Sequence, residues 1–117
     1  TKIGGGGLVG INAYPTSTLL VSGSFGTAYS ATATSLTAGI SVHTIEVTAT
    51  GQTITLPTAV GCTGREYTIK LTGSGTGTVA TTSSQTIDGS TTYSLSAQYK
   101  YVTVQSTGAN WIIIANN

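Results

Sequence analysis

Residues 85–115 read QTIDGSTTYSLSAQYKYVTVQSTGANWIIIA, three short runs of β-forming side chains separated by turn residues. The run 99–106 alternates, with Val102 and Val104 on one face and tyrosine or polar side chains on the other. This period of two predicts a strand with one buried face. The last run, 111–114, is apolar on both faces, which predicts a strand covered on both sides, either central in a sandwich or pressed against a neighbouring subunit.

Two features of this stretch specify a turn and a core anchor. Asp88-Gly89 lies between two of the runs and predicts a hairpin turn, because a type I′ turn needs positive φ at both central residues. Trp111 is the largest side chain of the apolar run. Its burial contributes at most about 5 kcal/mol, at roughly 200 Å² and ~25 cal/mol per Å². We therefore expect Trp111 to anchor the core.

Upstream residues extend the same pattern. Alternating runs at 44–48, 53–56, 66–71 and 78–87 are separated by glycine, proline and threonine, and no segment has the period of a helix. The inward side chains of all these runs predict the core: Ile54, Leu56, Tyr67, Ile69, Leu71, Leu95, Val102, Val104, Trp111 and Ile113. We predict an all-β fold, an antiparallel β-sandwich or jelly-roll-like domain, assembled as a β-prism-like trimer.

The small side chains of the N-terminal third predict a different role for that segment. Residues 1–39 begin with a glycine-rich leader and continue with weak strands rich in alanine, serine and threonine, too small to build a core alone. We expect an arm or linker over residues 1–39, which packs against the C-terminal part or a neighbouring chain. The antiparallel β domain is expected over residues 40–117.

Composition bounds the class of partner. Charged side chains make up 6% of the 117 residues, against roughly 25% in ordinary soluble domains. The four cationic side chains are scattered, which argues against nucleic acid or an anionic membrane as a partner. No apolar run approaches the ~18 residues of a membrane span. The single Cys62 is interpreted as a spectator thiol, with an intermolecular disulfide as the alternative.

Three segments in this order resemble a known family. TITLPTA (53–59), GREYTIKL (64–71) and QTIDGSTTYSLSAQYKYVTVQSTGANWIII (85–114) are similar to the C-terminal domain of bacteriophage tail-fibre and related virion appendage proteins. The resemblance implies a setting at the distal end of a fibre on the virion surface, usually as a trimer, and brings no catalytic residues. The matching positions are Pro57, Gly64, Arg65, Tyr67, Ile69, Ile87, Asp88, Gly89, Leu95, Tyr99, Val102, Gly108 and Trp111.

Few side chains could support catalysis or hold a metal. The chain has three carboxylates, Glu46, Glu66 and Asp88, and one histidine, His43. Asp88 is explained by its turn, and Glu46 lies on an outward strand face, so no acid pair for hydrolysis is apparent. His43 is interpreted as a buried, hydrogen-bonded residue at a sheet edge, with a three-fold axial metal site in a trimer as the alternative. We predict no enzymatic activity and no cofactor.

Exposed tyrosines are the best candidates for ligand contact. Tyr99 and Tyr101 are expected on the face opposite Val102 and Val104, where tyrosine offers apolar area and a hydroxyl to a sugar or a protein. The alternative is that both tyrosines pack against an adjacent subunit or sheet.

These observations lead to three hypotheses of function. The first is a non-enzymatic virion structural or adhesion domain of a phage tail or head fibre, which forms a homo-oligomer, contacts other virion proteins and binds a host-surface glycan or protein. The second is a repeated structural subunit, such as a capsid decoration protein or an extracellular fibre subunit, joined by its arm. The third is a small carbohydrate-binding module. The expected location is the virion surface, with a secreted or cell-surface protein as the alternative.

Overall fold

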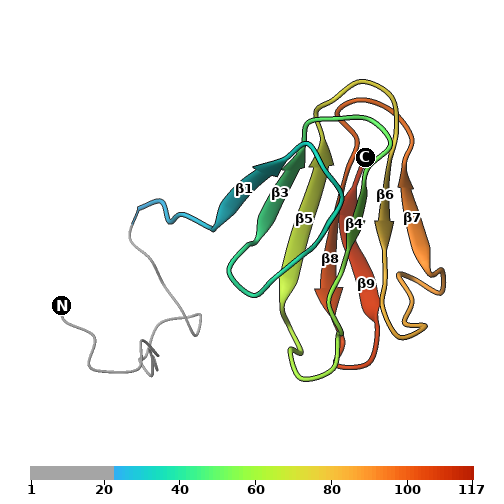
Figure 1. The fold of residues 1–117 in the computed structure, drawn as a ribbon. Helices are drawn as coiled ribbons and strands as arrows, with labels where there is room; N and C mark the ends of the chain where they lie inside the picture. Colours follow the sequence, from blue (N-terminus) through green and yellow to red (C-terminus); the bar gives the residue numbers. More distant parts are fainter. Residues whose placement is uncertain (1–22) are drawn as a thin grey trace.

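The computed structural model describes residues 23–117 (Figure 1), and the first part of the predicted arm, residues 1–22, lies outside the described residues. The described part contains strands and no helix, which confirms the all-β prediction, so nothing in it could cross a membrane as a helix. The strands are β1 (Tyr29–Thr32), β2 (Leu36–Thr37), β3 (Thr44–Val47), β4 (Thr53–Thr55), β5 (Glu66–Leu71), β6 (Gly77–Ala80), β7 (Thr92–Leu95), β8 (Tyr101–Ser106) and β9 (Trp111–Asn116).

The strands form two mixed sheets. The five-stranded sheet has the order β1-β3-β5-β8-β9, and the four-stranded sheet has the order β2-β4-β6-β7. Pairing is parallel from β1 to β3 to β5 and from β2 to β4 to β6. It is antiparallel only from β5 to β8, β8 to β9 and β6 to β7. The prediction of an antiparallel fold is therefore wrong for the pairings among the first six strands.

Parallel pairing arises because the chain changes sheet after each of the first five strands. Each of the consecutive strand pairs β1–β2, β3–β4 and β5–β6 contributes one strand to each of the two sheets. After such a pair, the chain returns to the first sheet, and the next strand there must run in the same direction as its predecessor. Alternation alone cannot reveal this order, since hydrophobic periodicity is the same in parallel and antiparallel strands buried on one face.

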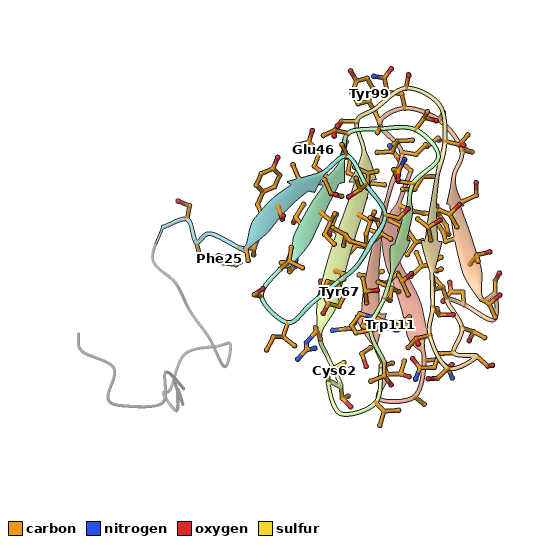
Figure 2. All side chains as sticks on the ribbon, in the orientation of Figure 1. Phe25, Glu46, Cys62, Tyr67, Tyr99 and Trp111 are labelled. Carbon is orange, nitrogen blue, oxygen red and sulfur yellow. The ribbon has the colours of Figure 1, made fainter. Side chains whose placement is uncertain are left out.

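The core lies between the sheets. Nine of the ten predicted core residues are buried, with exposed fractions of at most 1%, whereas Ile113 is only partly buried. Tyr67 from β5 and Trp111 from β9 pack against each other in this core, with ring centroids 5.6 Å apart and planes inclined at 56° (Figure 2). This tilted contact between two fully buried aromatic rings joins the middle of the five-stranded sheet to its edge.

β9 is an edge strand, not a central one. Its side chains Ile112 and Ile114 remain 40% and 49% exposed. The apolar run 111–114 is thus covered on one face only, and a register shift opposite Thr103 and Val104 interrupts its pairing with β8. The interpretation of this run as a strand central in a sandwich, covered on both faces, is therefore wrong.

The turn at Asp88-Gly89 has the expected backbone conformation. Asp88 has φ 47° and Gly89 φ 87°, the pair of positive values that a type I′ turn requires. The flanking strands are shorter than expected, because β6 ends at Ala80 and β7 begins at Thr92. Only an isolated bridge between Ile87 and Ser90 closes the turn.

Edge strands β1 and β2 begin the described sheets. Residues 29–37, which the sequence analysis assigned to the arm, hold both strands. β1 pairs with β3 over four residues and β2 pairs with β4 over two. This part of the arm consequently lies within the sheets.

Candidate functional site

The outer face of the five-stranded sheet carries a row of charged and aromatic side chains. Glu46 on β3 is the register partner of Lys70 on β5, and Lys70 is the partner of Tyr101 on β8. All three point outward because the residues beside them in their strands are buried in the core. Tyr29 on β1 reaches this row through its hydroxyl group. We call Tyr29, Glu46, Lys70 and Tyr101 the outer row.

Glu46 is held by two hydroxyl groups. Thr72 donates a hydrogen bond of 2.6 Å to Oε2, and Tyr29 donates one of 2.5 Å to Oε1. These bonds stabilise the carboxylate, so they hold the pKa of Glu46 below its usual range, with the larger effect from Thr72. The same hydrogen bond raises the pKa of the Tyr29 hydroxyl, because the phenol must keep its proton in order to donate to the carboxylate. The carboxylate is therefore fixed in position and charged at neutral pH.

Lys70 lies over an aromatic ring. Its Nζ is 5.7 Å from the ring centroid of Tyr101, within the range of a cation–π contact. The aromatic face partly orients the ammonium group, while the remaining surface of both half-buried side chains faces outward. A negative group, a positive group and two phenol rings thus lie on neighbouring strands, about 4.8 Å apart from one strand to the next.

Tyr99 occupies a turn and not the strand. The strand predicted from residue 99 begins at Tyr101, and Tyr99 has φ 69° with its backbone N–H bonded to the carbonyl of Leu71 at 2.6 Å. The predicted alternation therefore fails for its first two residues, because this bond turns the chain. Tyr99 is 57% exposed at one end of the sheets (Figure 2), whereas Tyr101 is half-buried on the outer face.

Sequence reasoning missed Tyr29 and Lys70 as members of this surface. Tyr29 was assigned to the arm, and only the parallel pairing of β1 with β3 brings its hydroxyl to Glu46, 17 residues later. Lys70 alternates with the core residues Ile69 and Leu71, which marked it as outward but gave no indication of its neighbours. The partner of a strand in a parallel sheet lies at the end of a long connection, and no local signal records it.

The remaining candidate groups have structural partners. The His43 ring nitrogen Nδ1 lies 3.1 Å from the hydroxyl of Thr44, and the partly buried Cys62 thiol faces the carbonyl of Thr58 at 3.4 Å. Asp88 accepts a hydrogen bond of 3.1 Å from the Ile113 amide. Within residues 23–117, no three side chains of histidine, cysteine, aspartate or glutamate gather in the manner of a metal site.

Comparison with known proteins identified no relative. Neither the family models, nor the curated proteins, nor the solved structures contain a match to this chain.

Proposed function

We propose that this chain is a non-enzymatic structural and adhesion domain of a virion, carried on a phage tail or head fibre, that binds a host-surface glycan or protein through the outer row. Support for the virion setting is the sequence pattern at 53–59, 64–71 and 85–114. Support for adhesion is the composition of the outer row itself. The domain belongs on this proposal to the virion surface and contacts other virion proteins.

The outer row is the observation that carries the proposal. Two of only seven charged side chains in the whole sequence stand side by side in it, between two tyrosines. Aromatic rings provide apolar faces for the C–H groups of a sugar, while a fixed carboxylate accepts hydrogen bonds from sugar hydroxyls and an ammonium donates to them. Tyrosine also offers contact area at low entropic cost in a protein interface.

A trimer is proposed as the assembly. Ile112 and Ile114 remain exposed on β9, at one edge of the five-stranded sheet. An exposed apolar edge is a liability in a monomer, and burial against a neighbouring copy would remove it. The finer fold proposed for the assembly is a three-fold β-prism of sandwich-like domains.

Binding is tested with glycans and host-surface proteins displayed on arrays. Tyr101→Ala should weaken binding by about tenfold or more, as loss of a contact of roughly 1.4 kcal/mol predicts. Phe25→Ala is the matched control, since Phe25 is an exposed aromatic residue outside the sheets. Absence of binding to glycans and host-surface proteins alike, or equal loss in both variants, would contradict adhesion through the outer row.

Assembly is tested by light scattering. A mass of three chains that falls to one chain in an Ile112→Glu/Ile114→Glu variant supports the trimer and the edge that forms it. A stable monomer with measurable sugar affinity would instead favour the small carbohydrate-binding module. Larger assemblies that depend on residues 1–39 would favour the second candidate, a repeated structural subunit such as a capsid decoration protein or an extracellular fibre subunit.

A further inference from the structure

Glu46 and Lys70 carry opposite charges on neighbouring strands without neutralising each other. They are register partners, yet among the described residues no ion pair joins Lys70 to a carboxylate. The Glu46 oxygens accept hydrogen bonds from Thr72 and Tyr29, whereas the Lys70 ammonium lies over the ring of Tyr101, one strand further away. The two charges are therefore held apart, at one to two strand spacings or about 5–10 Å.

Both charged groups keep unused hydrogen-bonding capacity. An ionised carboxylate offers roughly four lone-pair sites, and the two hydroxyl groups occupy two of those on Glu46. The Lys70 ammonium has three N–H donors, and its contact within residues 23–117 is the aromatic ring of Tyr101. A ligand can thus accept hydrogen bonds from Lys70 and donate them to Glu46 without breaking a hydrogen bond of the fold.

The neighbouring part of the outer face is uncharged. Thr44, Thr68 and Thr103 form the next register row along the strands, and the hydroxyls of Thr68 and Thr103 are bonded to each other at 2.8 Å. Glu66, the other carboxylate on β5, lies four residues from Lys70, about 13 Å along the strand. Charge on this part of the face is thus confined to one carboxylate and one ammonium group.

A ligand that covers the outer row must replace the water around both charges. Removal of that water is costly unless the ligand supplies an opposite charge or strong hydrogen bonds. A purely anionic ligand at Lys70 would be repelled by Glu46, and a purely cationic ligand at Glu46 would be repelled by Lys70, since the two charges lie within about one Debye length. The complementary ligand therefore carries both charges.

We propose that the outer row binds a zwitterionic glycan, a sugar chain that carries both an ammonium group and an acidic group. The ammonium group lies at the Glu46 carboxylate, the acidic group at the Lys70 ammonium, and a sugar ring packs on Tyr29. That phenol ring is 63% exposed, and its hydroxyl is fixed by Glu46. The inference rests on the proposed function, in which the outer row is the adhesion site, and adds the charge of its ligand.

The extent of the outer row favours a glycan over a protein as the carrier of these charges. The row crosses β1, β3, β5 and β8, three strand spacings or about 14 Å. A stable protein interface needs roughly 800 Å² and about 20–30 residues on each partner. A row of four side chains is closer in size to a short oligosaccharide.

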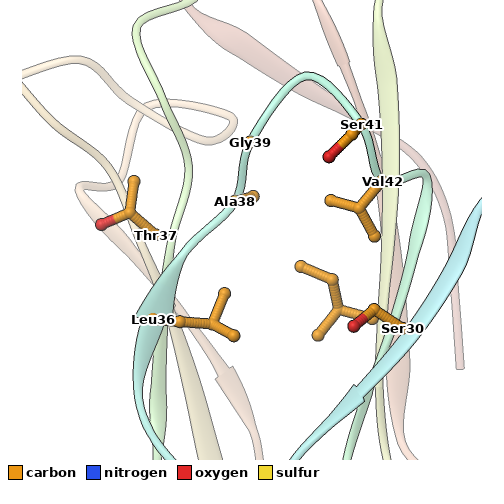
Figure 3. A pocket seen from close by; sticks show the side chains of 8 residues that line it. Ser30, Leu36, Thr37, Ala38, Gly39, Ser41 and Val42 are labelled. Atoms are coloured by element: carbon orange, nitrogen blue, oxygen red, sulfur yellow. The ribbon is translucent and has the colours of Figure 1, made fainter.

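The hollow between the edge strands β1 and β2 has a different chemistry. Its volume is about 350 Å³, and its lining includes Ser30, Leu36, Ser41 and Val42 (Figure 3). None of its lining side chains is charged. A ligand held in this hollow would not respond to the charge of the outer row, so charge variants show which of the two places is occupied.

Four disaccharides of similar size test the proposal with the full, unaltered chain. Glucosaminyl-N-acetylmuramic acid carries an ammonium group and a carboxylate, and N-acetylglucosaminyl-N-acetylmuramic acid carries the carboxylate alone. Glucosaminyl-glucosamine carries ammonium groups alone, and diacetylchitobiose carries no charge. In NMR titrations at about pH 6, where Glu46 remains ionised, the first should bind about tenfold or more tightly than each of the others. Salt at about 1 M should reduce this preference, because it screens exposed charges.

Charge variants assign each half of the ligand. Glu46→Gln should reduce the affinity of the zwitterionic disaccharide to that of the disaccharide with the carboxylate alone. Lys70→Gln should reduce it to that of the disaccharide with ammonium groups alone. Glu66→Gln and Lys100→Gln make the same changes of charge outside the outer row, so these matched controls should leave the affinity within about twofold, or roughly 0.4 kcal/mol.

The possible results separate this inference from the proposed function. Equally tight binding of the neutral or the purely acidic disaccharide would overturn the zwitterionic ligand and leave adhesion through the outer row in place. A capped lysyl-glutamate dipeptide that bound as tightly as the zwitterionic disaccharide would overturn the choice of a glycan. Absence of binding by all four disaccharides would overturn the inference, and the glycan and protein arrays show independently whether adhesion fails with it.

Discussion

The hydroxyl of Tyr29 on β1 donates a hydrogen bond of 2.5 Å to Oε1 of Glu46 on β3, and this bond ties the edge strand of the five-stranded sheet to its neighbour. Thr72 donates to the other carboxylate oxygen. The carboxylate therefore links the end of β5 to β1 across β3. Because the bonds favour its charged form, the linkage depends on pH.

Acid should weaken the fold through Glu46. The pKa of Glu46 is lower in the folded chain than its ordinary value of 4.5, so its contribution to stability is present above pH 4.5 and is lost as pH falls through the folded-state pKa. Glu46→Gln should flatten the dependence of Tm on pH in this window, as measured by circular dichroism.

Two hydroxyl variants separate the causes of this effect. Thr72→Val removes the larger contribution to the lowered pKa, and Tyr29→Phe removes the smaller one. Both should reduce the acid dependence of Tm, Thr72→Val more than Tyr29→Phe. An acid dependence that all three variants leave unchanged would contradict the assignment to Glu46.

Tyr29 should titrate at higher pH than an ordinary tyrosine. Its folded-state pKa is raised above 10.0, mainly by the hydrogen bond to Glu46, so its contribution to stability is complete below pH 10.0 and is lost as pH rises through the folded-state pKa. Absorbance titration of tyrosinate should lose one late-titrating group in Tyr29→Phe. Glu46→Gln should move that group toward lower pH, and an unchanged titration in Glu46→Gln would contradict the contact.

Part of this architecture was predictable from local pattern. Tyr67, Ile69 and Leu71 alternate with polar residues, so their burial followed from the period of two. The dipeptide Asp88-Gly89 predicted the hairpin turn that the structure contains. The direction of pairing was not predictable, because alternation is the same in parallel and antiparallel strands. The outer row depends on that direction, since Glu46 meets Lys70 only through parallel pairing.

Gln85 should be a strong determinant of stability despite its position in a loop. Its side chain is 8% exposed, accepts a hydrogen bond of 2.9 Å from the Ala59 amide and donates one of 2.8 Å to the Thr58 hydroxyl. Gln85→Ala leaves a buried amide without a partner, which costs about 1–3 kcal/mol. Gln98→Ala is the matched control, since Gln98 is exposed and its bond to the Thr72 carbonyl lies at the surface.

The measurement for Gln85 is chemical denaturation of both variants. Gln85→Ala should lower the free energy of unfolding by about 1–3 kcal/mol, and Gln98→Ala should lower it by about 0.5 kcal/mol or less. Equal effects would show that the bond from the Ala59 amide does not contribute to the stability of the loop.

Asp88 should tolerate asparagine but not alanine. Its φ of 47° lies in the left-handed region that asparagine also adopts, and Oδ1 accepts the hydrogen bond from the Ile113 amide. Asp88→Asn keeps both features, so its Tm should remain within a few degrees of wild type. Asp88→Ala loses both and should cost roughly 1–3 kcal/mol in thermal or chemical unfolding. Equal stability of the two variants would contradict a role for the side-chain oxygen.

Trp111 should respond differently to removal of its ring and to removal of its N–H group. The side chain is 1% exposed and packs on Tyr67, but its Nε1 has no hydrogen-bond partner among the described residues. Trp111→Ala removes the ring and should cost about 3–5 kcal/mol. Trp111→Phe keeps an aromatic contact and removes an unpaired N–H whose burial costs about 1–3 kcal/mol, which offsets part of the lost packing. Trp111→Phe should therefore lower the free energy of unfolding clearly less than Trp111→Ala.

The control for Trp111 is its neighbour in β9. Ile112 points to the opposite face and is 40% exposed, so Ile112→Ala should cost less than about 1.5 kcal/mol by chemical denaturation. If Trp111→Phe were as damaging as Trp111→Ala, then the N–H group would have a partner in solution, and an ordered water would be the group to look for. If Ile112→Ala matched Trp111→Ala, the exposed face of β9 would be buried in an assembly, as the proposed trimer requires.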